Sequence, residues 1–414
     1  MKILGMQVLA SAVLAVLSSG PAWATKVATV SAADQTEVTK GNHAFAVDLY
    51  GRLRAQPGNL FFSPESLSTA FAMADAGARG QTAAQMARVF HFTLPPERLH
   101  PAMGALLAGM NAPHPGYELR VADALWAEQD ARFLPEYLNL MQDDYGAGLH
   151  RVDFKGQPEA VRGTINAWVE RETNHRITNL IAPGVLTPLT RLVLTNAIYF
   201  KGTWRSPFDK AATQDGVFHL SRSQTATVPL MHRTGSGYRY YEGATFQELE
   251  MPYQAGAGSN ELAMVVLLPK EKDGLTKLEQ QFTPDAAQKW LGQLAPVSRV
   301  ILTLPRFRMT QQFELSSTLA AMGMPQAFSR QADFSGMTGK PEFRISAAIH
   351  KAYIDVNEEG TEAAAATAIG MRATAMRVEP EPVVFEADHP FLFMIRDRKT
   401  GAILFLGRVV DPRS

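Results

Sequence analysis

The chain has 414 residues, of which 46% are hydrophobic, with 40 basic and 40 acidic side chains and no cysteine. This charge balance argues against nucleic acid, other polyanions or a charged membrane surface as obligatory partners, because such partners select basic proteins. Without cysteine the chain has neither disulfides nor a thiol nucleophile. Stability therefore has to come from a hydrophobic core, which a chain of this length can supply.

The first 24 residues have the pattern of a secretory signal peptide. Lys2 supplies a positive charge, residues 9–17 form an apolar run too short to span a bilayer, and residues 22–24 (Ala-Trp-Ala) match a cleavage site. The segment resembles a bacterial export signal, so we expect a secreted or periplasmic protein, with an uncleaved N-terminal anchor as the alternative. Residues 25–36 are small and polar and predict a flexible lead-in.

Helical patterns dominate the first third of the chain. Phe45, Leu49 and Leu53 recur at helical spacing, and Ser63 followed by Pro64 is typical of a helix start. Helices are predicted over residues 42–53, from 63 onward, and over 81–90, 101–110 and 164–181.

Strand patterns dominate the second half. Strands are predicted over residues 119–126, 192–200, 245–251, 262–268, 300–305, 352–356, 391–395 and 403–409, with a hairpin turn at 397–401. Helices first and strands later indicate an α+β fold. No Pro/Ser-rich linker or internal repeat follows residue 37, which favours a single domain over residues 37–414.

Motifs for enzyme chemistry are missing. The ten histidines show no metal-ligand spacing, and the sequence contains no Gly-x-Ser-x-Gly, phosphate-loop or Gly-x-Gly-x-x-Gly motif. An exported enzyme with a dispersed Ser/His/Asp triad remains an alternative, but no residue pattern points to one.

Residues 358–371 are dominated by small side chains (EEGTEAAAATAIGM). An Ala-rich run is by itself more typical of a helix. As a strand, however, it would place Thr361, Ala363, Ala365 and Thr367 on one small, nearly neutral face. Glu362 would lie on the other face.

Several segments, in their order along the chain, resemble the serpin family of serine protease inhibitors. They are residues 59–66 (NLFFSPES), 196–204 (NAIYFKGTW), 304–307 (LPRF), 332–337 (ADFSGM), 350–352 (HKA), 388–393 (DHPFLF) and 405–409 (FLGRV). Together they are highly specific. The resemblance covers residues 37–414 and implies a serpin fold of about nine helices and three β-sheets.

The resemblance also implies a reactive loop at about residues 358–380. Its hinge comprises Glu358, Glu359, Gly360, Thr361, Glu362, Ala363, Ala364, Ala365, Ala366 and Thr367. In such an inhibitor the target serine protease cleaves the loop and forms a covalent acyl-enzyme. The hinge then inserts into the large sheet as a new strand, its first face becoming buried only after cleavage, and the trapped protease is distorted. The uncleaved fold is metastable.

Two further groups of residues follow from the resemblance. Ser63, Ser66, Asn196 and His350 match the polar cluster that bridges the central strands, here called the shutter cluster. At the top of the sheet, in the region called the breach, Trp204 matches a tryptophan, and Arg306 and Glu358 match an ion pair. We expect that pair to lie at the surface and to contribute little stability.

Counting from Glu358 with the family spacing of about seventeen residues places the scissile bond between Thr374 and Ala375. A small residue before that bond suits an elastase-like or subtilisin-like protease. Arg372 and Arg377 are alternatives for a trypsin-like enzyme, and Met371 for a chymotrypsin-like one.

The resemblance implies no cofactor, a monomer, and no nucleic-acid or membrane partner. Arg98 is the only fixed positive charge in residues 92–101, so no glycosaminoglycan partner is expected. The alternatives are a non-inhibitory serpin that acts as a binding protein and an inhibitor of papain-like cysteine proteases. The small hinge face favours inhibition of serine proteases.

Overall fold

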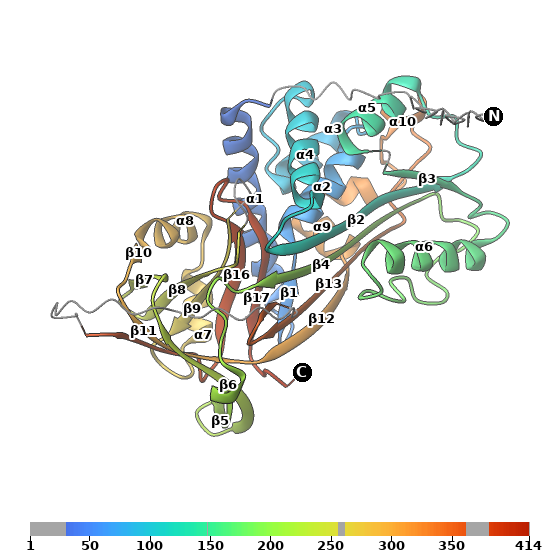
Figure 1. The fold of residues 1–414 in the computed structure, drawn as a ribbon. Coiled ribbons are helices and arrows are strands. Elements are labelled where there is room, and N and C mark those ends of the chain that lie inside the picture. Colours follow the sequence, from blue (N-terminus) through green and yellow to red (C-terminus); the bar gives the residue numbers. More distant parts are fainter. Residues whose placement is uncertain (1–29, 147, 256–260, 362–380, 414) are drawn as a thin grey trace, which may run out of the picture.

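A computed structural model describes residues 30–146, 148–255, 261–361 and 381–413, in which helices pack against three β-sheets (Figure 1). This confirms the predicted α+β fold with three β-sheets, and the described ranges contain ten α-helices where about nine were expected. The described helices are α1 (Ala32–Leu53), α2 (Pro64–Asp75), α3 (Gly80–Phe90), α4 (Pro96–Asn111), α5 (Pro135–Tyr145), α6 (Pro158–Glu172), α7 (Leu275–Gln281), α8 (Pro284–Gln293), α9 (Ser316–Met322) and α10 (Ser335–Thr338), with the 3-10 turns η1 (Lys210–Ala212) and η2 (Pro325–Phe328).

The six-stranded sheet contains the longest strands and is the large sheet of the serpin resemblance. Its order is β12 (Phe307–Glu314), β13 (Ala347–Asn357), β14 (Gly360–Thr361), β4 (Leu192–Thr203), β2 (Tyr117–Glu128) and β3 (Leu149–Val152). β13 and β4 run parallel and pair directly from Ala347–Val193 to Tyr353–Tyr199. Beyond that point the short strand β14 lies between them.

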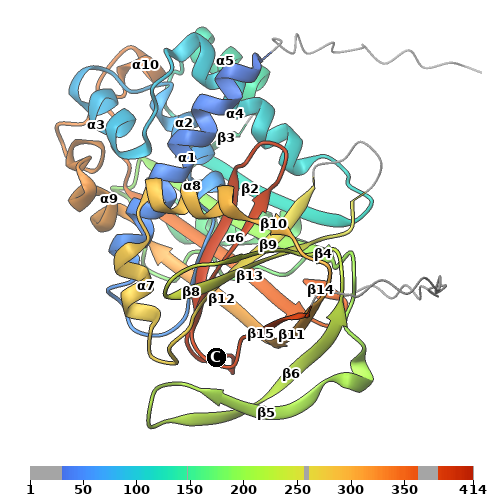
Figure 2. The same cartoon turned by 90° about the vertical axis from the view of Figure 1, so that its left-hand side faces the viewer.

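The two other sheets complete the fold (Figure 2). The seven-stranded sheet has the order β1 (Leu60–Phe62), β17 (Ile403–Val409), β16 (Phe391–Asp397), β9 (Leu262–Pro269), β8 (Phe246–Pro252), β7 (Arg239–Glu242) and β10 (Ala295–Pro296). The four-stranded sheet has the order β15 (Val383–Glu386), β11 (Val300–Pro305), β6 (Thr225–Gly235) and β5 (Gln214–His219).

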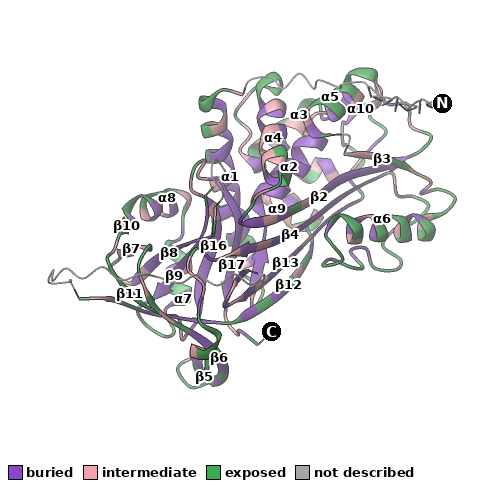
Figure 3. Cartoon of the chain, viewed as in Figure 1, coloured by how far each residue is buried: buried purple, intermediate pink, exposed green. Residues whose placement is uncertain are grey.

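Burial explains why the central strands are so apolar (Figure 3). Every residue of β9 and β17 is buried, as expected for strands covered on both faces. In β2 the side chains alternate: Leu125 packs into the core beneath α1 and α2, whereas Trp126 packs with Ile165 and Val169 of α6. The six-stranded sheet is thus covered on both faces where α6 packs on it, whereas one face of β12 and of the second half of β13 is partly open to solvent.

The N-terminal lead-in is shorter than predicted. Residues 32–36, expected to be flexible, form the first turn of α1, because the Ser31 hydroxyl caps the helix by accepting a hydrogen bond from the Asp34 amide at 3.1 Å. Arg98 of α4, the cation considered above for polyanion binding, also forms an ion pair with Asp34.

The helix predicted over residues 164–181 is wrong in its second half. α6 ends at Glu172, and Asn174 and His175 adopt positive φ angles of 48° and 60°. The Thr173 hydroxyl accepts a hydrogen bond from the Ile177 amide at 3.2 Å, which stabilises a turn in place of another helical turn.

No helix within the described ranges is long and apolar enough to cross a membrane. The same ranges hold no group of three or more His, Cys, Asp or Glu residues arranged to bind a metal ion.

Candidate functional site

The first residues of the hinge are already part of the six-stranded sheet. Gly360 and Thr361 form β14, which pairs antiparallel with Asn357 and Val356 of β13 on one side and with Thr203 and Gly202 of β4 on the other. The hinge therefore begins as a strand at the end of the seam where β13 and β4 separate.

Thr361 is completely buried, and its hydroxyl lies 2.8 Å from the Tyr253 hydroxyl. The expectation that this residue becomes buried only after cleavage is wrong. The reason is local: β13 and β4 diverge beyond Tyr353 and Tyr199, which leaves room for one strand, and Tyr253 supplies a polar partner there.

Gly360 is required by the close approach of β4. Its φ angle is 152°, and a Cβ atom at this position would lie 1.9 Å from the Gly202 carbonyl oxygen. Any other residue would collide with the backbone of β4, so glycine permits the hinge to enter the sheet.

The remaining predicted loop residues lie outside the described ranges. They are Glu362, Ala363, Ala364, Ala365, Ala366 and Thr367 of the hinge, and Met371, Arg372, Thr374, Ala375 and Arg377 around the scissile bond.

Glu358 anchors the start of the hinge. Its carboxylate accepts hydrogen bonds from Arg306 Nε and from the Thr213 hydroxyl, both at 2.6 Å. The backbone is held as well, because the Phe208 amide donates to the Glu358 carbonyl at 2.8 Å and the Trp204 amide to the Glu359 carbonyl at 2.9 Å.

Only one partner of the Arg306–Glu358 pair lies at the surface, where both were expected. The Glu358 side chain is 2% exposed and that of Arg306 43% exposed. Burial alone would raise the pKa of Glu358, but the hydrogen bonds from Arg306 and Thr213 outweigh it and hold the pKa below its usual value. The carboxylate is therefore ionised at neutral pH, and removal of Arg306 would leave a buried charge unpaired.

Trp204 lies beside the hinge. Its indole Nε1 donates to the Asn357 carbonyl at 3.0 Å, and its ring stacks on Tyr253 with a centroid distance of 4.5 Å. Tyr253 in turn contacts Thr361, so the two rings form the floor beneath β14.

The structure brings the four residues of the shutter cluster together. The Ser63 amide donates to His350 Nε2 at 3.1 Å, and the Asn196 amide nitrogen donates to the Ser66 hydroxyl at 2.5 Å. His350 Nδ1 is hydrogen bonded to the Asn196 amide oxygen. These bonds connect the start of α2 to the two strands that border the seam.

Asp123 of β2 is a fifth member of this cluster, and sequence reasoning missed it. Its Oδ1 accepts hydrogen bonds from the Ser66 hydroxyl at 3.1 Å and from Asn196. A single acidic residue in the otherwise apolar run 121–127 was the available signal. Three adjacent strands therefore contribute one residue each, in register, to the cluster.

His350, the histidine of the shutter cluster, is uncharged at neutral pH. Burial lowers the pKa of His350 to about 3 and raises that of Asp123 well above its usual value. Because Nε2 accepts the Ser63 amide hydrogen, the proton of the neutral ring sits on Nδ1 and is donated to Asn196.

Comparison with known proteins identifies the class to which this arrangement belongs. The model of the family described as serpin (serine protease inhibitor) matches residues 40–412. The chain therefore belongs to the serpin family, and its class is that of a serine protease inhibitor and not that of an enzyme.

Individual relatives agree with this assignment. Human leukocyte elastase inhibitor is 42% identical over 385 residues, which cover 91% of this chain and 100% of that protein. An uncharacterized serpin-like protein of Thermococcus kodakarensis is 38% identical over 390 residues, which cover 94% and 89%.

Solved structures show the same fold. Uncleaved ovalbumin superposes with a TM-score of 0.81 at 30% identity, covering 91% of this chain and 100% of that chain. Human thyroxine-binding globulin has a TM-score of 0.81 at 31% identity, covering 92% and 99%.

We predict that His350 makes stability sensitive to acid. The pKa of His350 is about 3 in the folded protein and 6.5 in the unfolded chain. The contribution of His350 to the free energy of unfolding is therefore fully present above pH 6.5. It is lost as the pH falls toward 3, because the unfolded chain binds the proton first. The slope is about 1.4 kcal/mol per pH unit in that window. His350→Gln should flatten this part of the thermal unfolding profile measured at a fixed scan rate. His175→Gln, at a side chain that is 77% exposed, is the control, and equal slopes for both variants would contradict the prediction.

We predict that Gly360→Ala displaces β14, because its methyl group would collide with the backbone of β4. Hydrogen exchange of the backbone amides at residues 356–361 should accelerate by about tenfold or more. Gly163→Ala, at a position with nothing within 4 Å, should leave exchange unchanged. Unchanged exchange in Gly360→Ala would show that β14 is not held as described.

Proposed function

We propose that this protein traps a serine endopeptidase as a suicide substrate. The protease serine hydroxyl attacks the carbonyl carbon of the loop residue before the scissile bond. The peptide bond breaks, the new amine leaves with a proton, and an ester joins the loop to the protease. Insertion of the hinge between β13 and β4 then traps this covalent complex before water hydrolyses the ester.

The position of β14 is the observation that carries this proposal. Gly360 and Thr361 are aligned between the two strands that must part. If the hinge continued β14 beyond Thr361, the new strand would run antiparallel to both β13 and β4. It would separate the residue pairs that now join these two strands, from Tyr353–Tyr199 to Ala347–Val193. One ladder of backbone hydrogen bonds is thereby replaced by two.

The hinge sequence suits this path. Thr361 faces the buried side, toward Tyr253, and strand alternation assigns Ala363, Ala365 and Thr367 to the same side. These side chains are small and uncharged, so their burial requires neither overpacking nor desolvation of a charge. Glu362 alternates to the opposite side.

A protease with a small or apolar specificity pocket is the proposed target. Thr374–Ala375 remains the proposed scissile bond, with Arg372, Met371 and Arg377 as alternatives. The names of relatives such as human and bovine leukocyte elastase inhibitor support an elastase-like target.

We further propose that the protein acts as an exported monomer without a cofactor, in the periplasm or outside a bacterial cell. The support for export and for a bacterial source is the N-terminal segment 1–24 alone, which lies outside the described residues.

Thr361→Arg should convert the protein from an inhibitor into a substrate. Because residue 361 is already buried in the uncleaved fold, we expect an arginine there to be excluded from the sheet before cleavage, so that insertion would first have to bury the guanidinium. A buried unpaired guanidinium costs several kcal/mol, and each ~1.4 kcal/mol slows insertion about tenfold, so hydrolysis of the ester should win. The measurement is the fraction of protease in a complex stable on denaturing gels. Glu362→Arg, on the opposite face, is the matched control and should retain complexes. If Thr361→Arg still trapped protease as efficiently as wild type, insertion along this seam would be wrong.

We predict that elastase challenge releases a C-terminal fragment beginning at Ala375, together with a high-mass complex. Mass spectrometry of that fragment identifies the bond. A fragment beginning at Ala373 with trypsin as the better inhibited enzyme would replace Thr374 by Arg372. Cleavage by every protease in a serine and papain-like panel, without any complex, would favour a non-inhibitory binding protein.

A further inference from the structure

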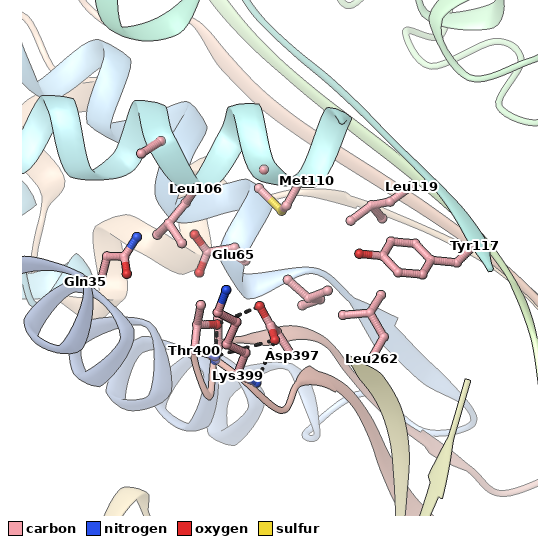
Figure 4. Close-up of a pocket in the computed structure, with 14 residues that line it drawn as sticks. Gln35, Glu65, Leu106, Met110, Tyr117, Leu119, Leu262, Asp397, Lys399 and Thr400 are labelled. Atoms are coloured by element: carbon pink, nitrogen blue, oxygen red, sulfur yellow. Dashed lines mark hydrogen bonds between the residues drawn. The ribbon is translucent and has the colours of Figure 1, made fainter. Parts of the chain in front are cut away.

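A cavity of about 190 Å³ lies between α1, α2, α4, β2 and the turn that joins β16 to β17 (Figure 4). It is separate from the hinge, the breach and the shutter cluster, none of whose residues line it. An apolar cavity of about 150 Å³ is large enough to admit benzene, so this space can accommodate a small organic molecule.

Glu65 is the unusual feature of the cavity wall. It lies in the first turn of α2, is 1% exposed, and neither of its carboxyl oxygens has a hydrogen-bond partner. Figure 4 shows its carboxyl group directed into the cavity. Burial, with no compensating positive charge, raises the pKa of this group to about 8. A buried carboxyl without a partner is costly, and such groups in native proteins call for an explanation.

Other charged groups at the cavity do not supply that partner. Asp397 is occupied by its own turn, accepting hydrogen bonds from the Lys399 amide at 2.8 Å and the Thr400 hydroxyl at 3.0 Å. The Lys399 side chain is exposed, and no hydrogen bond joins it to Glu65. Asp123 of β2, behind the cavity wall, is acidic and supplies no positive charge, and Glu65 contributes to raising its pKa.

The wall opposite these polar groups carries apolar side chains. Leu106 and Met110 of α4, Leu119 of β2, Leu262 of β9 and Leu404 of β17 line it. These side chains suit a compact hydrocarbon body, whereas Glu65 calls for one positively charged hydrogen-bond donor. Gln35 of α1 adds an uncharged polar group to the wall.

We propose that this cavity binds a small primary amine with a compact apolar body, whose ammonium group pairs with the Glu65 carboxylate while the body contacts the leucines and Met110. The ammonium donates hydrogen bonds to oxygens that otherwise have none, and the charge pair is formed out of water, where it is strong. A neutral molecule of the same shape would fill the space without supplying the charge.

Benzylamine is a suitable probe, with benzyl alcohol as its neutral counterpart. Isothermal titration of the full chain at pH 7, in phosphate and in HEPES, should give a Kd for benzylamine below about 1 mM and binding at least about tenfold weaker for benzyl alcohol. Because Glu65 is mainly protonated at that pH, benzylamine binding should release close to one proton, seen as a difference in heat between the buffers.

Two variants assign the binding to the proposed residue. Glu65→Gln, which keeps the shape and removes the charge, should weaken benzylamine binding at least about tenfold and leave benzyl alcohol binding unchanged. Lys289→Met, at an exposed lysine of α8 that does not line the cavity, should bind benzylamine as the wild type does. Equal affinity for the amine and the alcohol, unchanged binding in Glu65→Gln, or no saturable heat at 10 mM benzylamine (about ten times that Kd limit) would overturn the proposal. If Glu65→Gln does not fold, the wild type still tests the proposal: release of close to one proton on benzylamine binding supports it, and binding without proton release overturns it.

Discussion

The inhibitory mechanism depends on the seam between β13 and β4. The two strands are parallel and share backbone hydrogen bonds only along residues 347–353 and 193–199. Above this stretch the hinge already supplies a strand that is antiparallel to both. Because a strand inserted along the seam makes two ladders where one existed, the sheet can gain hydrogen bonds and buried surface by opening. A fold is metastable when the same chain has a more stable arrangement that it reaches only slowly, and strand insertion supplies such an arrangement here.

Two sets of polar groups hold the seam closed and define where it can open. Below, His350 and Asn196 face each other across it, and Ser63, Ser66 and Asp123 complete a buried network that closes only when the strands are together. Above, Glu358 is held by Arg306 and Thr213, so the hinge enters the sheet at a fixed residue. Parting the strands requires the His350–Asn196 hydrogen bond of the first set to break.

Much of the architecture could be predicted from sequence. The strands at residues 300–305 and 403–409 have the predicted bounds, because both consist mainly of apolar residues that become buried. The end of α6 was missed, because the Thr173 side chain competes with the helix locally. Asp123 was missed for another reason: its role depends on the register of β2 against β4, which pairs it with Asn196, seventy-three residues later.

The sequence by itself determined the small, neutral hinge face and the motifs that mark the serpin family, because side-chain size, charge and order are properties of the chain alone. Only the tertiary structure decided that Thr361 is buried before cleavage, that Glu358 is a buried and not a surface charge, and that Glu65 lies unpaired in a cavity. Burial depends on what other segments place around a residue. Here those segments come from β4, β12 and the β16–β17 turn, far away in the sequence.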